Sequence, residues 1–181
     1  MRSMLGRMKL TVVLALIAIV LALPASLFAA NSRVNGKSAA TPDPIVGFWY
    51  ITLTAEGNVP GPPDGTLIDW GLQQWHSDGT EILNSGSGPK RFCLGVWVKG
   101  PGRSGYKLNH FPLDYPDATT LHPINLREQV TLSRNHARMT GTFTFDVYDS
   151  AGNLLQHIAG KVDGHRITVG SSIQDILPPT S

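Results

Sequence analysis

From about residue 45 onward, apolar and polar residues alternate along the chain, and each alternating run ends in glycine, proline, aspartate or asparagine. Period-two alternation bounded by turn residues is typical of antiparallel strands, whereas a helix would show an apolar stripe with a period of about 3.6 residues. No such stripe stands out in this part of the sequence. We therefore expect an all-β fold, with strands at about 46–54, 66–76, 80–84, 91–99, 105–114, 124–134, 138–148, 154–162 and 165–170.

The segments between these strands are mostly short, which favours hairpins between consecutive strands. They include "SDG", "SGSGP" and "DSAGN", whose residues readily adopt the φ values that tight turns need. An open sheet of eight or nine strands has two unpaired edges, and closing it into a barrel removes both. We predict an antiparallel up-and-down β-barrel of about eight to nine strands, with a two-sheet sandwich as the alternative.

The first thirty residues differ from the rest. Three basic residues precede an uncharged apolar run at 10–23, which is followed by proline and small residues. This order predicts a signal peptide over 1–30. The run is shorter than the roughly 20 residues of a comfortable transmembrane helix, so a permanent anchor is the less favoured alternative. We expect a secreted or periplasmic protein with no stable membrane insertion after cleavage.

The remaining sequence is predicted to be one domain preceded by a tether. Residues 31–44 are polar, small and proline-containing, which is typical of a flexible linker. The predicted barrel occupies 45–170, and 171–181 form a C-terminal tail. Because Cys93 is the single cysteine, no intrachain disulfide can form, and burial must stabilise the fold.

The formal charge argues against one class of partner. It is +2 for the whole chain, and it falls to −1 without the three basic residues of the leader. Domains that bind nucleic acid are usually strongly basic. We expect no nucleic-acid partner and, by default, a monomer.

Alternation within the strands predicts which side chains line the interior. Glu128 shares its phase with four aliphatic residues of its strand, which is unusual because burying an unpaired carboxylate costs several kcal/mol. His110 is in phase with Leu108. An apolar interior with a few polar groups is the usual composition of a small-molecule pocket. The expected ligand-binding residues are Trp49, Trp70, Gln74, His76, Tyr106, His110, Glu128, Phe143 and Phe145.

The leading functional prediction is that the barrel binds a small hydrophobic ligand of unknown identity. The polar side chains would anchor the ligand's hydrogen-bonding groups. A bulge would shift the parity of a strand, and Trp75, which is out of phase with Trp70, hints at one. In that case the polar residues would lie at the rim or on the surface.

Two alternatives use the same barrel differently, and we expect binding rather than catalysis. In the first, Glu128, His110 and Tyr106 are candidate catalytic residues of an acid-base enzyme of the cyclase or isomerase type. In the second, the core is filled and exposed aromatic residues contact a partner. Those residues are Phe48, Tyr50 and Tyr148.

Metal and cofactor sites are not expected. None of the six histidines belongs to a His-any-His pair, which disfavours a cupin-type metal site. A metal site built from His76, His110 and Glu128 is the residual alternative. Cys93, between Phe92 and Leu94, is expected to be a buried small hydrophobe.

Several stretches together resemble a known family. Gly47-Phe48-Trp49 opens the first predicted strand, and the proline- and glycine-rich loop "AEGNVPGPPDG" follows that strand. The stretches "HSDGTEI", "GVWVKGPGRSGYKLNHF" and "TGTFTFDVYDSAGNLL" add to the likeness. Over 45–170 the sequence is similar to the secreted bacterial lipocalin-like, or calycin-like, β-barrel family, most of whose members are uncharacterised.

The resemblance implies a lipocalin-like barrel and gives three residues a structural role. Gly47 would let the chain turn tightly into the barrel, Trp49 would close its floor, and Arg166 would pack on Trp49. The assigned parity sets Arg166 opposite Ile167, so contact with Trp49 would need a bend at the strand end.

Overall fold

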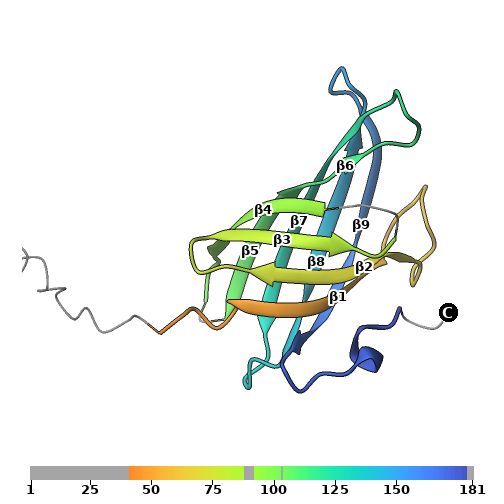
Figure 1. Ribbon diagram of the computed structural model, residues 1–181. Helices are drawn as coiled ribbons and strands as arrows, with labels where there is room; N and C mark the ends of the chain where they lie inside the picture. Colours follow the sequence, from red (N-terminus) through yellow and green to blue (C-terminus); the bar gives the residue numbers. More distant parts are fainter. Residues whose placement is uncertain (1–40, 88–91, 103, 179–181) are drawn as a thin grey trace, which may run out of the picture. The chain divides into compact units, whose positions relative to one another are not determined.

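Strands make up most of the folded chain in the computed structural model, which describes residues 41–87, 92–102 and 104–178 (Figure 1). The predicted signal peptide and most of the predicted linker lie outside the described residues. The elements are β1 Gly47–Ala55, β2 Leu67–Trp75, β3 Thr80–Ser85, β4 Phe92–Lys99, β5 Gly105–Phe111, β6 Leu113–Asp114, β7 His122–Leu132, β8 Arg138–Tyr148, β9 Leu154–Ile167 and the 3₁₀ helix η1 Ile173–Ile176.

The strands close into a barrel. β1 pairs with both β2 and β9, and β5 pairs with both β4 and β7, so that eight antiparallel strands form a continuous ring. The two-residue β6 pairs with β7. Strands that are neighbours in the ring also follow one another along the chain, apart from β6 and the closing pair. The structure thus confirms the predicted all-β up-and-down barrel.

The last strand differs from the prediction. The sequence predicts two strands, at 154–162 and 165–170, around a turn at Asp163-Gly164, but β9 continues through that dipeptide to Ile167. Gly164 is paired on both sides, with Ile51 of β1 and Met139 of β8. A Cβ on residue 164 would lie 2.8 Å from Met139 Cγ. The glycine therefore provides space for close packing and does not mark a turn.

The inner face of β1 has the predicted phase. Trp49, Ile51 and Leu53 are fully buried, while Phe48 remains 38% exposed. Apolar side chains of the other strands complete the core. The further members are Ile45, Ala55, Trp75, Leu83, Cys93, Tyr106, Leu108, Leu126, Val130, Leu132, Met139, Phe143, Ile158 and Val162.

Arg166 stacks on Trp49 at one end of the barrel, the end predicted to be its floor. The guanidinium carbon of Arg166 lies 4.2 Å from the centroid of the Trp49 ring, and Trp49 Nε1 donates to the Ile45 carbonyl at 2.9 Å. The two residues are direct register partners in β1 and β9, so the bend that the assigned parity required is absent. Gly47 has a φ of +142°, and a Cβ there would collide with Arg166 Nη1. Both constraints favour glycine at position 47.

The C-terminal segment covers part of the outer surface. The Tyr50 hydroxyl donates to the Leu177 carbonyl at 2.9 Å, and His165 Nε2 lies 2.8 Å from the Asp175 carbonyl oxygen. Tyr50 points outward from β1, yet only 6% of its surface is exposed. Tyr50 is therefore not an exposed contact point, contrary to the expectation for a filled-core interaction domain.

Candidate functional site

Three ionisable side chains meet in the middle of the barrel. His110 of β5 lies between Glu81 of β3 and Glu128 of β7. Its Nδ1 is 3.4 Å from Glu81 Oε2, and its Nε2 is 3.4 Å from Glu128 Oε1. All three side chains are fully shielded from solvent. This Glu81–His110–Glu128 cluster contains two of the predicted site residues and one, Glu81, that was not predicted.

A glycine allows these side chains to meet. Glu81 pairs with Gly95 of β4, and Gly95 pairs with His110 of β5, so the three residues form one row across three strands. A Cβ on residue 95 would lie 2.6 Å from His110 Cβ and 2.7 Å from Glu81 Oε2, which is closer than non-bonded atoms approach. The missing side chain therefore gives Glu81 and His110 the room to meet over β4.

Two residues of β2 hold Glu128 in place. Gln73 Nε2 donates to Glu128 Oε1 at 3.3 Å and to Oε2 at 3.5 Å. Trp75 Nε1 donates to Gln73 Oε1 at 2.9 Å. Because an indole N–H can only donate, it fixes the Gln73 amide with its nitrogen toward the carboxylate. Glu128 thus contacts an amide on one side and His110 on the other.

The cluster has unused hydrogen-bonding capacity. Both carboxylate oxygens of Glu81 and both ring nitrogens of His110 are buried, and among the described residues they have no hydrogen-bond partner. The 3.4 Å contacts are ion-pair contacts, longer than the roughly 2.7–3.2 Å of a good N–H···O bond. Buried polar groups in native proteins nearly always have partners, either in the protein or in ordered water. The unsatisfied atoms mark this position as a candidate binding site.

The surroundings set the charge of the cluster. Burial by itself lowers the pKa of His110, but the adjacent Glu128 and Glu81 outweigh this effect and raise that pKa to about 9. Burial also raises the pKa of Glu81, against the opposing influence of His110. At neutral pH His110 is therefore an imidazolium. The Glu81 carboxyl holds its proton up to a higher pH than a carboxyl exposed to water does. Such a set of groups can hold and pass a proton.

Three further residues of the predicted interior are Phe143, Phe145 and Tyr106. Phe143 is buried as the register partner of Glu128. Phe145 is half-buried, two residues further along β8. Tyr106 is buried too, but its hydroxyl donates to Asp43. Because Asp43 engages that hydroxyl, Tyr106 is not joined to His110 and Glu128 as the enzyme alternative assumed.

β2 has the opposite phase from the predicted one. The inward-facing positions of β2 are Asp69, Gly71, Gln73 and Trp75. Trp70 and Gln74, both predicted to bind ligand, lie on the outer side, and Gln74 is exposed. The two tryptophans differ in what they contact: Trp75 finds a hydrogen-bond acceptor in the core, whereas Trp70 packs on the outside with its ring 6.1 Å from that of Tyr50. A buried indole needs such an acceptor.

His76 follows β2 and is half-buried. Its backbone forms the β2–β3 connection, with the amide donating to the Thr80 carbonyl at 2.9 Å and the carbonyl accepting from Trp97 Nε1 at 2.9 Å. Its Nε2 atom is buried without a hydrogen-bond partner in the described part of the chain. His76 is thus a turn residue and does not join the contacts of the central cluster.

Glu81 and Gln73 are the site residues that sequence analysis missed. Glu81 shares its phase with Leu83 in "TEIL", which is the same kind of signal that singled out Glu128. The signal for Gln73 is the phase of Trp75, since choosing Trp75 over Trp70 for the interior brings Gln73 inward as well. Both signals can be found in the sequence, but short strands leave the choice of phase open.

A small void lies toward the end of the barrel opposite Trp49, and no residue of the cluster is part of its lining. It measures about 10 Å³, roughly enough for one water molecule. One of its lining residues, Leu126, is the register partner of His110, so the void is one side chain away from the cluster. Its lining consists of Asp69, Ser85, Cys93, Pro112, Leu113, Asp114, Ile124, Leu126 and Phe145.

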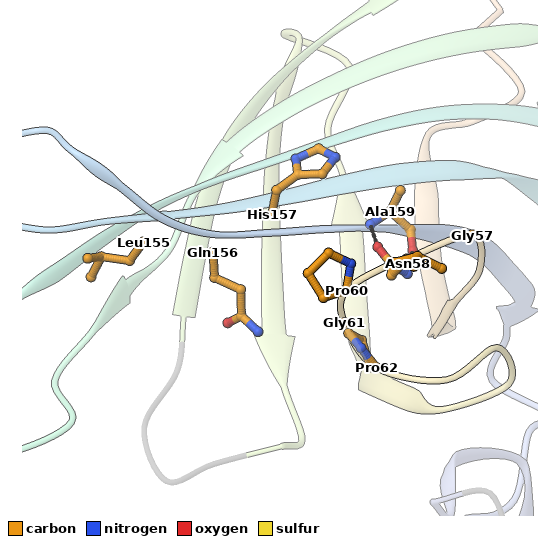
Figure 2. Close-up of a pocket in the computed structure, with 10 residues that line it drawn as sticks. Gly57, Asn58, Pro60, Gly61, Pro62, Leu155, Gln156, His157 and Ala159 are labelled. Carbon is orange, nitrogen blue, oxygen red and sulfur yellow. Dashed lines mark hydrogen bonds between the residues drawn. The ribbon is translucent and has the colours of Figure 1, made fainter.

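A larger cleft lies between the loop after β1 and the first half of β9 (Figure 2). It has a volume of about 440 Å³ and is bordered by 57–62, 155–157 and Ala159. Asn58 ties the loop to β9, because its Nδ2 donates to the Ala159 carbonyl and its Oδ1 accepts from the Ala159 amide, each at 2.8 Å. His157 Nδ1 contacts Asp146 Oδ1. The volume lies in the range of small-molecule sites.

In 41–87, 92–102 and 104–178, no group of three or more histidine, cysteine, aspartate or glutamate residues could hold a metal ion. His76, His110 and Glu128 are thus not assembled into a metal-ligand set there. Over the same ranges, no helix is both long and apolar enough to span a membrane.

No family model, curated protein or solved structure matches this chain. The closed antiparallel barrel of eight strands is consistent with a calycin-like fold and compatible with ligand binding. Because one barrel fold serves many functions, the function has to be argued from the site.

Proposed function

We propose that this protein binds a small molecule inside the barrel. The ligand's hydrogen-bonding end would contact the Glu81–His110–Glu128 cluster, and its apolar part would lie against the surrounding core. Export from the cytoplasm is part of the proposal, supported by the predicted leader. The Gly47-Phe48-Trp49 opening and the stacking of Arg166 on Trp49 support grouping the chain with the lipocalin-like barrels.

The buried polar atoms without partners carry this proposal. An apolar core of the same volume would avoid the several kcal/mol that unpaired buried polar or charged groups cost. A ligand group that both donates and accepts, such as a hydroxyl or an amide, can donate to Glu81 and accept from His110. The proposed ligand is therefore an apolar molecule with a hydroxyl or amide at one end.

The ligand would enter at the end of the barrel next to the void. Cys93, Leu126 and Phe145 give that end an apolar wall, and the chain at 112–114 lies over it. Because the void holds about one water molecule, binding requires 112–114 to move outward. β6 contributes only two register pairs with β7, so fewer ladder contacts oppose this movement than in the longer strands.

The outer cleft of Figure 2 supports binding less strongly. Its fixed polar groups are already engaged, since the Asn58 amide is bonded to Ala159 and His157 Nδ1 contacts Asp146. The central cluster, in contrast, has polar atoms without partners.

Native mass spectrometry of the protein isolated from its own source tests the proposal. We expect the wild type to retain a small molecule, and the variants His110→Gln and Glu128→Gln to lose it. Glu56→Gln is the matched control, because Glu56 is half-exposed and pairs with Lys161 away from the cluster. The control variant should retain the molecule.

Two results would contradict interior binding. In the first, the wild type and Glu56→Gln carry no molecule when isolated, and no sample binds any member of a library of apolar alcohols and amides. The other is that the cluster variants, with circular dichroism spectra like the wild type, keep the molecule. The first result would favour a filled core.

Acid-base catalysis is a second candidate, favoured by one observation: Glu81, whose pKa is raised by burial, contacts His110. A buried carboxyl in contact with an imidazolium is suited to pass a proton to a ligand and take it back. If the barrel moves a proton on its ligand, incubating the retained molecule with wild-type protein in D₂O should add deuterium at a carbon position. His110→Gln should slow this exchange, and no exchange with either protein would favour binding alone.

A further inference from the structure

The outer side of β3, β4 and β5 carries an apolar surface. Every outward position of β4 is apolar, and these four side chains are between 58% and 64% exposed. Leu94, at the centre, pairs with Ile82 of β3 on one side and with Phe111 of β5 on the other. We call this surface the β4 face; it consists of Ile82, Phe92, Leu94, Val96, Val98 and Phe111.

The next strand around the ring, β7, which pairs with β5, shows what an outer face in contact with water looks like. β7 presents Arg127, Gln129 and Thr131 outward, and all three are exposed. Antiparallel strands with one solvated face normally alternate in this way, with polar residues outside. The β4 face departs from that rule over a whole strand, which indicates that it is covered by a partner.

The size of the β4 face fits a protein interface. From the exposed fractions, its six side chains present on the order of 600 Å², the upper end for the largest apolar patch of a monomer. A standard interface buries about 800 Å² per partner, including a polar rim. Thr80, Asn84 and Lys107 lie around the face and supply such a rim.

We propose that this protein forms a two-fold symmetric dimer through the β4 face. The four apolar residues of β4 are spaced evenly about Gly95. A two-fold axis near Gly95 would set Phe92 against the partner's Val98 and Leu94 against the partner's Val96. A second copy thereby supplies an apolar surface of the same size, as an isologous interface requires. This proposal is independent of the ligand site and replaces the default expectation of a monomer.

Other occupants fit the β4 face less well. Residues 31–40, which precede the described chain, are mostly polar, with Val34 as the single large apolar residue. The apolar run at 10–23 belongs to the predicted signal peptide and would be removed. A lipid surface usually attracts basic side chains, and the six residues of the face carry no charge.

Sedimentation velocity over a concentration series tests the dimer. We expect the wild type to sediment as a dimer and Val96→Lys to raise the dissociation constant at least about tenfold, because a lysine at the centre of an apolar interface is left unpaired. Val169→Lys is the matched control, since Val169 is exposed on the C-terminal segment, away from the face. Val96→Thr keeps the β-branched shape and should weaken the dimer less than lysine does.

Circular dichroism separates loss of the dimer from loss of the fold. If Val96→Lys does not fold, Leu94→Lys and Val96→Thr carry the test. A wild type that stays monomeric at all concentrations would overturn the proposal, and flotation of that monomer with phosphatidylcholine vesicles would assign the face to a lipid surface. A dimer that persists unchanged in folded Val96→Lys and Leu94→Lys would also overturn it.

Discussion

At the scale of single residues, two glycines leave the space that larger side chains need in order to meet. Gly95 leaves the space in which Glu81 and His110 meet, and Gly47 leaves the space that Arg166 occupies. A glycine inside a strand pattern indicates a close approach of some kind. Which side chain uses the space depends on neighbouring strands, so the partners of these glycines appear only in the folded barrel.

Replacing Gly95 by alanine should destabilise the protein. The new Cβ would lie 2.6 Å from His110 Cβ and 2.7 Å from Glu81 Oε2, so the side chains of Glu81 and His110 would have to move apart. Overpacking of this kind typically costs about 1–3 kcal/mol in free energy of unfolding. Urea denaturation measures the effect, with Gly170→Ala as control because a Cβ there meets nothing closer than 3.7 Å. Equal stabilities for the two variants would show that the spacing at Gly95 is not critical.

At the scale of secondary-structure elements, one arginine joins three parts of the chain at the floor of the barrel. Arg166 of β9 donates to the carbonyl groups of Pro44 and Val46, which precede β1, and to that of His136, in the β7–β8 turn. Its guanidinium also stacks on Trp49. The floor therefore depends on the geometry of a planar guanidinium more than on its charge.

Arg166→Ala should destabilise the barrel by about 3 kcal/mol, since several hydrogen bonds from a charged donor and one cation–π contact are lost. Arg166→Lys should recover little of this loss, because an ammonium cannot reach the same carbonyls in a fork. Thermal unfolding monitored by tryptophan fluorescence measures both variants, and Arg138→Ala, on an exposed residue of β8, is the control. Full recovery by lysine would mean that charge alone matters at the floor.

At the scale of the whole molecule, the buried cluster couples stability to pH. The pKa of His110 is about 9 in the folded protein and 6.5 ordinarily. Below pH 6.5 both states hold the proton and the stabilisation is fully present; between 6.5 and about 9 only the folded state holds it, so stability falls as the pH rises. Glu81, whose pKa is also raised, acts in the same direction above 4.5.

The free energy of unfolding should therefore decrease between pH 7 and 9, with at most about 1.4 kcal/mol per pH unit from His110. His110→Gln should flatten this dependence, and His122→Gln, on a histidine outside the cluster, should not. Denaturant titrations at several pH values supply the comparison. If His110→Gln does not fold, Glu81→Gln removes one of the carboxylates that raise the His110 pKa and should reduce the slope. A pH dependence identical in all folded variants would contradict the proposed protonation of His110.

Local pattern was enough for the fold and for part of the site. Alternation and turn residues predict the barrel because each strand needs one apolar face, and this requirement acts within a few neighbouring residues. His110 and Glu128 stood out for the same reason, as polar residues in phase with apolar ones. The phase of β1 was also predictable, since Trp49, Ile51 and Leu53 leave little choice.

Only the tertiary structure decided what depends on contacts between strands. β2 contains tryptophans in both phases, and the core acceptor for Trp75 selects the phase that brings in Gln73. The Asp163-Gly164 dipeptide has turn composition, but β1 and β8 pair with it from both sides and keep it extended. Closure places Glu81 beside His110 across Gly95. Sequence alone thus determined that this chain makes a barrel with polar groups inside, and packing between strands decided which groups meet, because hydrogen-bond partners and free volume come from segments distant along the chain.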